Sequence, residues 1–325
     1  MSLEATRQCT SARERDMPTA RPSSVQNLQR PSRIQPNPVS GMHQRGVTLI
    51  ELMVGVVIGL LVVAVAMAAL MVSRGISGTV SDASTIQQQG AYAMRVIGKQ
   101  LRQTSSLRLN LDPGTTKTES NYMIPVAFET SAPPIAGGLA YDPVNDSLKG
   151  TATPVTLTAG YRRYTEPVFV NNTIQETLSR NCLGGPADTS TDEILENVFS
   201  LNTSDNTLQC NGNRVGNQPL IRNVANFQVR YLLQDNTSNP GHPTIRSVDA
   251  SGVGTNEWGQ VQAIEVCLVL YGTEPIDLPA NSTYTDCDGT AVDMSTLTGE
   301  QAKRMHLPFR GTFQLRSQGL IGSVL

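Results

Sequence analysis

The sequence has few of the residues and none of the short motifs on which common catalytic sites depend. Its three histidines, His43, His242 and His306, lie far apart, and none belongs to an HxH or HExxH pattern. A GxSxG elbow, a GxxxxGKS/T phosphate loop and a GxGxxG turn are also absent. Histidine-based zinc sites, nucleophile elbows and nucleotide-binding loops are therefore not expected. We predict no catalytic residue, no cofactor and no enzymatic activity.

Two features that could bind a ligand each have a simpler structural interpretation. Asp142, Asn145 and Asp146 could offer oxygen atoms to calcium, but the sequence Asp-Pro-Val-Asn-Asp is typical of a turn. The single tryptophan, Trp258, is flanked by Glu257 and Gly259, which favours packing at a turn or in the core. We therefore predict no metal site.

Charge is distributed unevenly along the chain. Residues 1–46 hold seven arginines against three acids, which leaves 18 of the 25 basic and 24 of the 27 acidic residues after Gly46, a net charge of about −6. A body with this balance lacks the general basic footprint of nucleic-acid-binding proteins. No nucleic-acid partner is expected.

One segment has no charge at all. Leu52–Val72 reads LMVGVVIGLLVVAVAMAALMV, and about 21 residues at 1.5 Å each span a hydrocarbon core of roughly 30 Å. A secretory signal has a shorter apolar stretch that ends at a cleavage site of small residues. An ordinary membrane anchor leaves Glu51 unexplained, because a carboxylate at the start of such a segment costs about 2–3 kcal/mol if lipid buries it.

The residues around Glu51 match a known pattern. Arg45–Val54, RGVTLIELMV, resembles the processing motif of type IV prepilins, in which cleavage follows a glycine and a glutamate stands fifth in the mature chain. Gly46 and Glu51 match in identity and spacing, while Val47 stands where phenylalanine is commoner. The resemblance implies that a prepilin peptidase cuts between Gly46 and Val47 and that the new amino terminus on Val47 is methylated.

The motif divides the chain into three parts. Residues 1–46 form the prepilin leader, and residues 1–41 need not be translated, because Met42 can begin the short leader MHQRG. Residues 47–108 are expected to form one helix, transmembrane in its first half and amphipathic in its second. Residues 109–325 are expected to form a β-rich domain outside the cytoplasm, because the basic leader favours a cytoplasmic N-terminus.

Glu51 has a physical role in assembly that does not depend on the family. When such helices pack together, its carboxylate can meet the positive amino terminus of a neighbouring subunit, and this pairing offsets the cost of burial. The alternative is that Glu51 reaches the lipid headgroups and needs no partner.

Five cysteines are present, and four of them follow the leader that contains Cys9. In an exported body the simplest pairing by proximity is Cys182 with Cys210 and Cys267 with Cys287. Each bridge would contribute roughly 3–4 kcal/mol by loop entropy. Four cysteines allow three connectivities, and buried free thiols are the alternative.

The apolar pattern continues beyond Val72 with helical spacing, which predicts an amphipathic helix that faces a sheet. The residues that form this stripe are Ile76, Val80, Ala83, Gly90, Met94, Ile97 and Leu101. Four cations lie near the end of the helix, where they favour the C-terminal dipole: Arg95, Lys99, Arg102 and Arg108. A solvated face is the simplest interpretation of these cations.

The rest of the body indicates β-structure. Residues 110–190 are rich in Pro, Gly, Thr, Ser and Asn, which predicts short strands and long loops. Period-two alternation predicts strands that contain Phe227–Leu233, Ile264–Leu270 and Phe309–Leu315. We predict an α+β pilin fold in which the long helix packs on one antiparallel sheet.

Several details of the body are similar to the minor pilins called PilW. They are the Cys182 to Gly212 region, the strand at Asn223–Leu233, Trp258 before the Val261–Tyr271 strand, and the late strand with Arg and Phe. The resemblance implies a non-enzymatic subunit that starts type IV pilus assembly and lies at the tip. Its expected partners are prepilin peptidase, other minor pilins, the major pilin, the inner-membrane assembly platform and membrane lipid. The expected locations are the inner membrane and then the pilus, with roles in adhesion and twitching motility.

Two alternatives remain open at this point. A pseudopilin of type II secretion shares the leader motif and the fold. An adhesin or receptor at the filament end would use the loop-rich body for display.

Overall fold

The computed structural model describes residues 46–104, 108–109, 126–127, 129, 131–168, 171–235, 242 and 244–315. The described residues divide into two units, the first ending at Val62 and the second beginning at Val63. The boundary between them lies inside the first helix, whereas the sequence prediction placed its divisions after residues 46 and 108. Cys9, His43 and the rest of the predicted leader up to Arg45 lie outside the described residues.

Helix α1 runs from Leu49 to Gln103. In the second unit it buries Ile86, Ala93, Ile97 and Leu101, at spacings of seven and four residues, which place all four on one helix face. The predicted stripe is confirmed at Ile97 and Leu101 but wrong at Val80, which is 65% exposed. The carboxylate of Asp82 is buried there instead, because it accepts hydrogen bonds from the backbone nitrogen and hydroxyl of Thr273, both at 2.9 Å.

A four-stranded antiparallel sheet contains all three strands that alternation predicts. Its order is β11 (Thr244–Val248), β10 (Val224–Asp235), β12 (Val261–Tyr271), β15 (His306–Gln314). In the register of this sheet Tyr231 lies opposite Ile264, and Ile264 lies opposite Phe313. Strand β10 buries every second residue over most of its length, as the sequence indicates.

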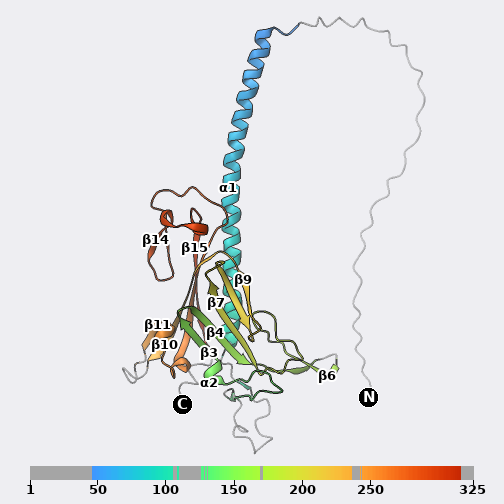
Figure 1. Cartoon of the computed structure of the whole chain (residues 1–325), viewed down its shortest axis with the longest axis vertical. Helices are drawn as coiled ribbons and strands as arrows, with labels where there is room; N and C mark the ends of the chain where they lie inside the picture. Colours follow the sequence, from blue (N-terminus) through green and yellow to red (C-terminus); the bar gives the residue numbers. More distant parts are fainter. Residues whose placement is uncertain are drawn as a thin grey trace, which may run out of the picture. The chain divides into compact units, whose positions relative to one another are not determined.

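The predicted α+β fold, a long helix packed on antiparallel strands, is confirmed, but a second antiparallel sheet, of five strands, is present where one sheet was expected. Its order is β3 (Leu148–Ala152), β4 (Val155–Arg162), β7 (Ile194–Asn202), β8 (Thr207–Gly212), β9 (Asn217–Ile221). Strand β7 buries Glu196 and Asn197 beside its apolar residues, so the simple alternation that marks a strand is lost. Figure 1 shows both sheets beside the second half of α1.

One core joins these elements. It contains Leu157, Phe199 and Leu208 from the five-stranded sheet, Phe227, Tyr231 and Ile264 from the four-stranded sheet, and Ile97 and Leu101 from α1. Burial of apolar side chains at about 25 cal/mol per Å² makes this shared core the main stabilising contribution to the second unit.

The remaining elements are short. The strand pairs are β1 (Arg108–Leu109) with β2 (Val126–Ala127), β5 (Glu166–Val168) with β6 (Asn171–Glu176), and β13 (Thr283–Thr285) with β14 (Ala291–Asp293). The helices are α2 (Pro143–Asp146), η1 (Ala250–Gly252), η2 (Trp258–Gln260), η3 (Met294–Thr296) and η4 (Gly299–Gln301).

Candidate functional site

The predicted processing site lies directly before α1. Gly46 and Val47 are exposed and precede the first helical residue, Leu49. Val47 is 72% exposed, and no atom lies within 4 Å of the position of a Cβ on Gly46. The peptide bond between these residues is therefore open to an enzyme.

Glu51 closes a capping box with Thr48. Its carboxylate oxygen Oε2 accepts hydrogen bonds from the backbone nitrogen and from the hydroxyl of Thr48, both at 2.9 Å. The backbone nitrogen of Glu51 donates to the Thr48 hydroxyl at 3.3 Å. This reciprocal pattern satisfies backbone donors that a helix start leaves free, and it places an anion at the positive end of the helix dipole.

Sequence reasoning missed this cap, although the spacing Thr48-x-x-Glu51 is its usual signature. The cap gives Glu51 a partner within its own chain. Both residues follow the predicted cleavage site, so removal of the leader would leave the cap in place. The predicted contact of Glu51 with the amino terminus of a neighbouring subunit would therefore compete with Thr48 for the same carboxylate.

The first half of α1 has no apolar partner among the described residues. Its most apolar window has a mean hydropathy of 2.8, and none of it is buried. The helix is long and apolar enough to cross a membrane. Gly55 and Gly59 have nothing within 4 Å of a Cβ position, so they would let a partner helix approach closely.

Two disulfides brace the second unit. Cys182 bonds to Cys210 with Cα atoms 6.5 Å apart, and Cys267 bonds to Cys287 with Cα atoms 5.6 Å apart. These are the two pairs of the sequence prediction. The first bridge ties the loop before β7 to β8, and the second ties β12 to the hairpin that contains β13 and β14.

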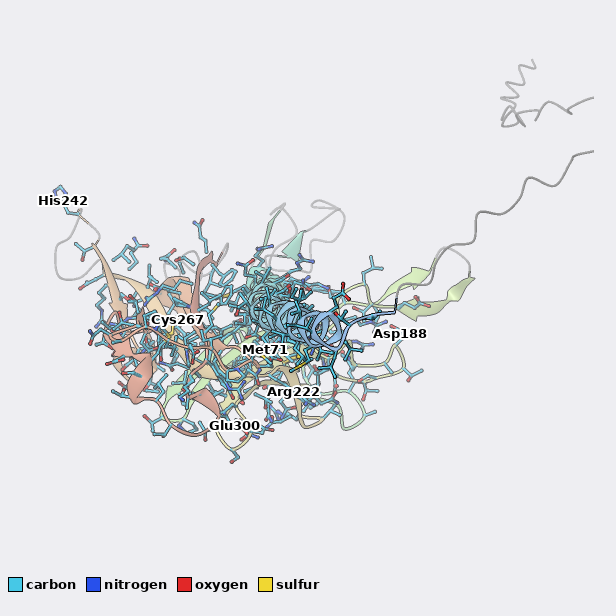
Figure 2. All side chains as sticks on the ribbon, turned by 90° about the horizontal axis from the view of Figure 1, so that it is seen from above. Met71, Asp188, Arg222, His242, Cys267 and Glu300 are labelled. Atoms are coloured by element: carbon cyan, nitrogen blue, oxygen red, sulfur yellow. A yellow bond between two sulfur atoms is a disulfide. The ribbon has the colours of Figure 1, made fainter. Side chains whose placement is uncertain are left out.

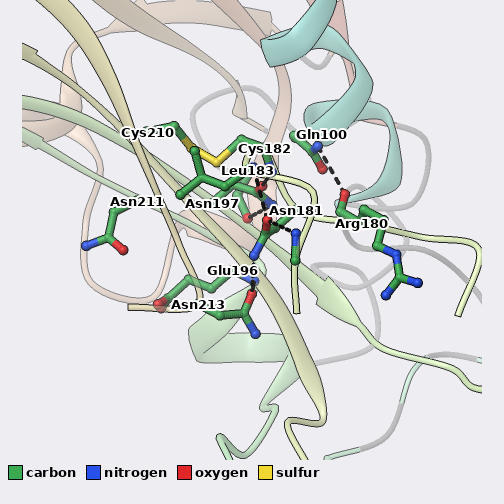
Figure 3. Close-up of a disulfide and its surroundings, with 12 residues drawn as sticks. Gln100, Arg180, Asn181, Cys182, Leu183, Glu196, Asn197, Cys210, Asn211 and Asn213 are labelled. Atoms are coloured by element: carbon green, nitrogen blue, oxygen red, sulfur yellow. Dashed lines mark hydrogen bonds between the residues drawn. A yellow bond between two sulfur atoms is a disulfide. The ribbon is translucent and has the colours of Figure 1, made fainter. Parts of the chain in front are cut away.

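Buried amides hold the first bridge in position (Figure 3). The Asn197 side chain accepts a hydrogen bond from the backbone nitrogen of Cys182 at 2.6 Å and donates to the carbonyl of Ala159 at 3.1 Å. Asn181 donates to the side-chain oxygen of Asn213 at 3.0 Å. These buried polar groups have hydrogen-bond partners, so their burial does not destabilise the fold. The network stabilises one conformation of the loop.

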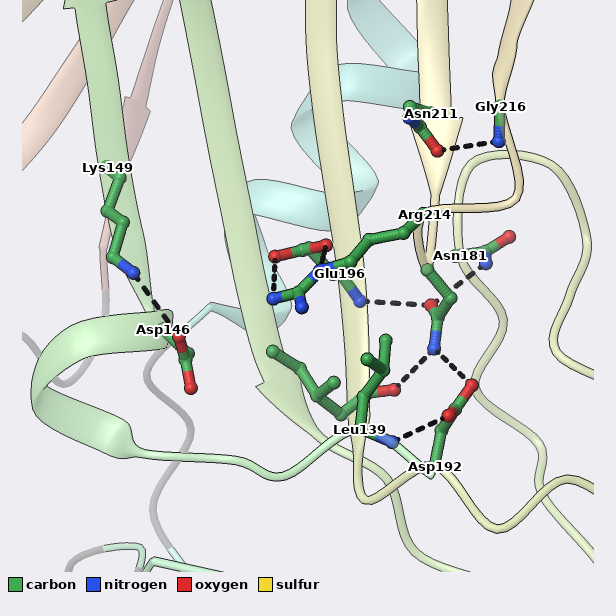
Figure 4. Close-up of polar contacts among 11 residues, drawn as sticks. Leu139, Asp146, Lys149, Asn181, Asp192, Glu196, Asn211, Arg214 and Gly216 are labelled. Carbon is green, nitrogen blue, oxygen red and sulfur yellow. Dashed lines mark hydrogen bonds and ion pairs between the residues drawn. The ribbon is translucent and has the colours of Figure 1, made fainter. Parts of the chain in front are cut away.

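Polar contacts continue from this network to neighbouring loops (Figure 4). Asn213 donates to Asp192 at 3.0 Å, and Asp192 accepts from the backbone nitrogen of Leu139 at 2.9 Å. Arg214 forms an ion pair with Glu196 at 3.1 Å, which raises the pKa of the arginine through the hydrogen bond and the negative charge. The network fixes the loops that surround β7.

The same region is joined to α1. The Gln100 side chain donates to the carbonyl of Arg180 at 3.2 Å, and the Tyr161 hydroxyl donates to the side-chain oxygen of Gln100 at 2.7 Å. Burial raises the pKa of Tyr161 well above its ordinary value, so this hydroxyl stays protonated as a donor. The disulfide loop therefore packs directly on the second half of the helix.

The possible calcium ligands form a turn, as the sequence interpretation favoured. Asp142 caps α2 by accepting from the backbone nitrogen of Val144 at 3.0 Å, and it also accepts from Asn145 at 2.7 Å. Asp146 accepts from the backbone nitrogen of Asp142 at 2.9 Å and from Lys149 at 3.3 Å. Across the described part of the chain, no group of three His, Cys, Asp or Glu side chains could hold a metal ion.

The tryptophan and the two remaining histidines have separate environments. Trp258 is partly buried and packs edge-on against Tyr231, with ring centroids 5.0 Å apart. His242 is exposed, whereas His306 is buried at the start of β15. Burial lowers the pKa of His306, whose ring stacks on Tyr284 at a centroid distance of 4.8 Å.

Comparison with known families identifies the class of protein. The model of the prokaryotic N-terminal methylation motif matches residues 41–67, which include the predicted cleavage site and Glu51. This motif before an apolar helix and an α+β body defines a type IV pilin. The model described as type IV pilus-assembly protein W (PilW) matches residues 174–317. Together the two matches support the assignment of the chain as a PilW-type minor pilin of a type IV pilus.

Other comparisons are distant. No curated protein matches the chain. A solved type IV-like pilin from Thermus thermophilus is 10% identical over 52% of this chain and 81% of its own, with a TM-score of 0.25. At that score the structural likeness adds nothing to the assignment.

Proposed function

We propose that this minor pilin is processed, anchored and assembled through its N-terminal helix. Prepilin peptidase cuts between Gly46 and Val47, and the new amino terminus on Val47 is methylated. The exposed bond before α1 and the match to the methylation motif support this processing. The apolar half of α1 then holds the chain in the inner membrane as a single span, with residues 109–325 in the periplasm.

In the assembly step that we propose, Glu51 selects the position of the subunit. The methylated amine on Val47 of one subunit and the Glu51 carboxylate of the next carry opposite charges, and lipid or packed helices provide a low dielectric that strengthens their attraction. A helix that slides out of register would leave a buried charge without its partner, at a cost of about 3–5 kcal/mol. The observation that carries the proposal is a carboxylate directly before the uncharged run Leu52–Val72 and shortly after the predicted processing site.

The proposed role is structural and not enzymatic. The subunit joins other minor pilins on the inner-membrane assembly platform, starts the filament and stays at its tip while the major pilin is added below. The two disulfides and the amide network around Cys182 suit a body that must stay folded outside the cell. No nucleic acid and no cofactor enter this role.

Deletion of the chain in cells that lack the retraction motor tests the priming role. Without retraction, every filament that starts remains on the surface and can be counted by electron microscopy. We expect very few filaments in the deletion strain, and normal numbers when the wild-type chain is restored. Filaments at normal number without the chain would exclude priming and favour a role in display.

A further inference from the structure

The second half of α1 has an exposed face with positive charge. Gln88, Tyr92, Arg95, Lys99 and Arg102 follow one another at three or four residues, and all five are exposed. At 100° per residue they lie within an arc of about 80° on the helix. We call these five residues the cationic stripe.

No acid balances the cationic stripe on the helix. Residues 83–103 contain no Asp or Glu, and the nearest acid, Asp82, is 5% exposed with its carboxylate bonded to Thr273. Within the described ranges, no ion pair is formed by Arg95, Lys99 or Arg102. By contrast, residues 104–325 hold 14 basic and 22 acidic residues. The positive face is a local feature of α1 on an acidic body.

An apolar groove adjoins the cationic stripe. It has a volume of about 370 Å³ and is lined by Gln88, Gln89 and Tyr92 of α1 and by Leu220, Ile221 and Arg222 at the end of β9. Tyr92 is 50% exposed at the point where the groove and the stripe meet. Arg222, labelled in Figure 2, is also exposed and adds a cation on the opposite side of the groove.

We propose that the cationic stripe and the groove form a docking surface for a different pilin subunit. The partner would offer an apolar side chain to the groove and Asp or Glu side chains to Arg95, Lys99 and Arg102. This inference rests on the proposed function, because the neighbours of a minor pilin in a filament are other pilins. Opposite charges at the rim steer association and fix register, while the apolar centre contributes affinity.

The structure favours this occupant over two others. A nucleic-acid backbone would use the cations but would leave the groove beside Tyr92 unfilled. A purely solvated stripe that complements the helix dipole explains Arg102 in the last turn, but the dipole effect falls off within one turn and does not reach Arg95. Neither alternative accounts for an exposed tyrosine between the charges and an apolar groove.

Photocrosslinking of the full-length chain in piliated cells tests the docking surface. Tyr92 is replaced by photoreactive p-benzoylphenylalanine, and Gln88 is replaced in a second strain in case the first variant folds poorly. After irradiation, mass spectrometry identifies the linked protein and peptide. We expect an adduct with another prepilin-derived subunit, through a peptide that contains Asp or Glu.

A matched pair of charge reversals gives the control. Lys99→Glu should lower the adduct yield about fivefold, as expected for the loss of roughly 1 kcal/mol at a rim contact. Lys303→Glu makes the same charge change at another exposed lysine of the second unit and should leave the yield unchanged. An Asp or Glu to Lys change in the linked peptide of the partner should restore the yield with Lys99→Glu.

Several results would overturn the proposal. They are an adduct only with a second copy of this chain, with nucleic acid or with lipid, the same yield in Lys99→Glu as in wild type, or an equal loss in Lys303→Glu. If the chain is present in sheared filaments but no pilin is linked at either position, the docking surface is wrong while the filament role stands. If the chain is absent from sheared filaments, the proposed function fails and the docking surface fails with it.

Discussion

Phe313 of β15 occupies the space that a side chain on Gly98 of α1 would need. A Cβ atom at Gly98 would lie 2.3 Å from Cε1 of Phe313, and one at Gly90 would lie 2.6 Å from the ring of Phe309. The two phenylalanines are four residues apart on one strand, so they point to the same face of the sheet. The two glycines are eight residues apart and share one face of the helix. Each phenylalanine ring therefore fills the space that the missing side chain of a glycine leaves open. These two contacts set the position of α1 against the four-stranded sheet.

Gly98→Ala should destabilise the second unit by about 1–3 kcal/mol, because the methyl group forces the Phe313 ring or the helix to move. Gly78→Ala is the matched control, since the nearest atom to its Cβ position is 4.0 Å away. That change should be neutral or stabilising by up to about 1 kcal/mol through helix propensity. Thermal unfolding of the detergent-solubilised variants measures both effects. Equal melting temperatures for the two variants would contradict a close contact between Gly98 and the Phe313 ring.

The buried His306 should make the second unit less stable in mild acid. Its ring nitrogen Nδ1 lies 3.0 Å from the carbonyl oxygen of Arg304, and Nε2 has no hydrogen-bond partner among the described residues. Burial lowers the pKa of His306 in the folded state, although the negative charge of Asp286 opposes the shift. The unfolded chain therefore takes up a proton first as pH falls below about 6.5.

The melting temperature of the wild type should thus decrease between pH 7.5 and pH 5. His306→Phe keeps the ring stacked on Tyr284 and should remove most of that decrease, whereas the exposed control His242→Gln should retain it. Melting curves at a series of pH values measure the effect. If the melting temperature of His306→Phe decreases as much as that of the wild type, other titratable groups cause the pH dependence.

The two disulfides should contribute similar stability but protect different regions. They close loops with sequence separations of 28 and 20 residues, and each should contribute roughly 3–4 kcal/mol. Replacing Cys267 and Cys287 by Ser should speed proteolysis within residues 283–293, because the β13–β14 hairpin loses its covalent tie to β12. Replacing Cys182 and Cys210 should expose the loop around Asn181 instead. Limited proteolysis with mass spectrometry distinguishes the two patterns, and identical cleavage in both variants would argue against local bracing.

The two roles of Glu51 can be separated by two substitutions. Glu51→Gln keeps a side chain that can complete the cap with Thr48 but removes the negative charge. Thr48→Ala keeps the charge and removes the cap, at a cost of about 1 kcal/mol in helix stability. If the charge drives assembly, Glu51→Gln should reduce the chain in sheared filaments at least about tenfold, a loss of roughly 1.4 kcal/mol or more, while Thr48→Ala stays near wild type. Immunoblots of filament and membrane fractions measure this. The reverse ranking would make Glu51 mainly a helix cap.

The elements that could be predicted from sequence are those in which one residue pattern dominates. The helix at Leu52–Val72 follows from a continuous apolar run, and β10 follows from an alternation with a period of two. The structure contains both elements. The five-stranded sheet could not be predicted, because Asn197 is buried in β7 and is satisfied by Ala159 and Cys182, which are remote in sequence.

In the candidate site, too, residues with a local sequence pattern could be predicted, whereas contacts between distant segments could not. Gly46 and Glu51 can be found from local spacing, and the spacing Thr48-x-x-Glu51 also indicates the capping box. The groove beside Tyr92 could not, because Leu220 and Ile221 reach α1 only through the fold. Val80 is exposed and Asp82 is buried for a similar reason, since the partner of Asp82 is at position 273.

The mature N-terminus decides most directly whether this chain acts as a processed pilin. Mass spectrometry of the protein from sheared filaments should find Val47 as the first residue, with a methyl group on its amine and residues 1–46 absent. A chain in the filament fraction that retains Gly46, or that begins at any residue other than Val47, would contradict the proposed assembly through Glu51.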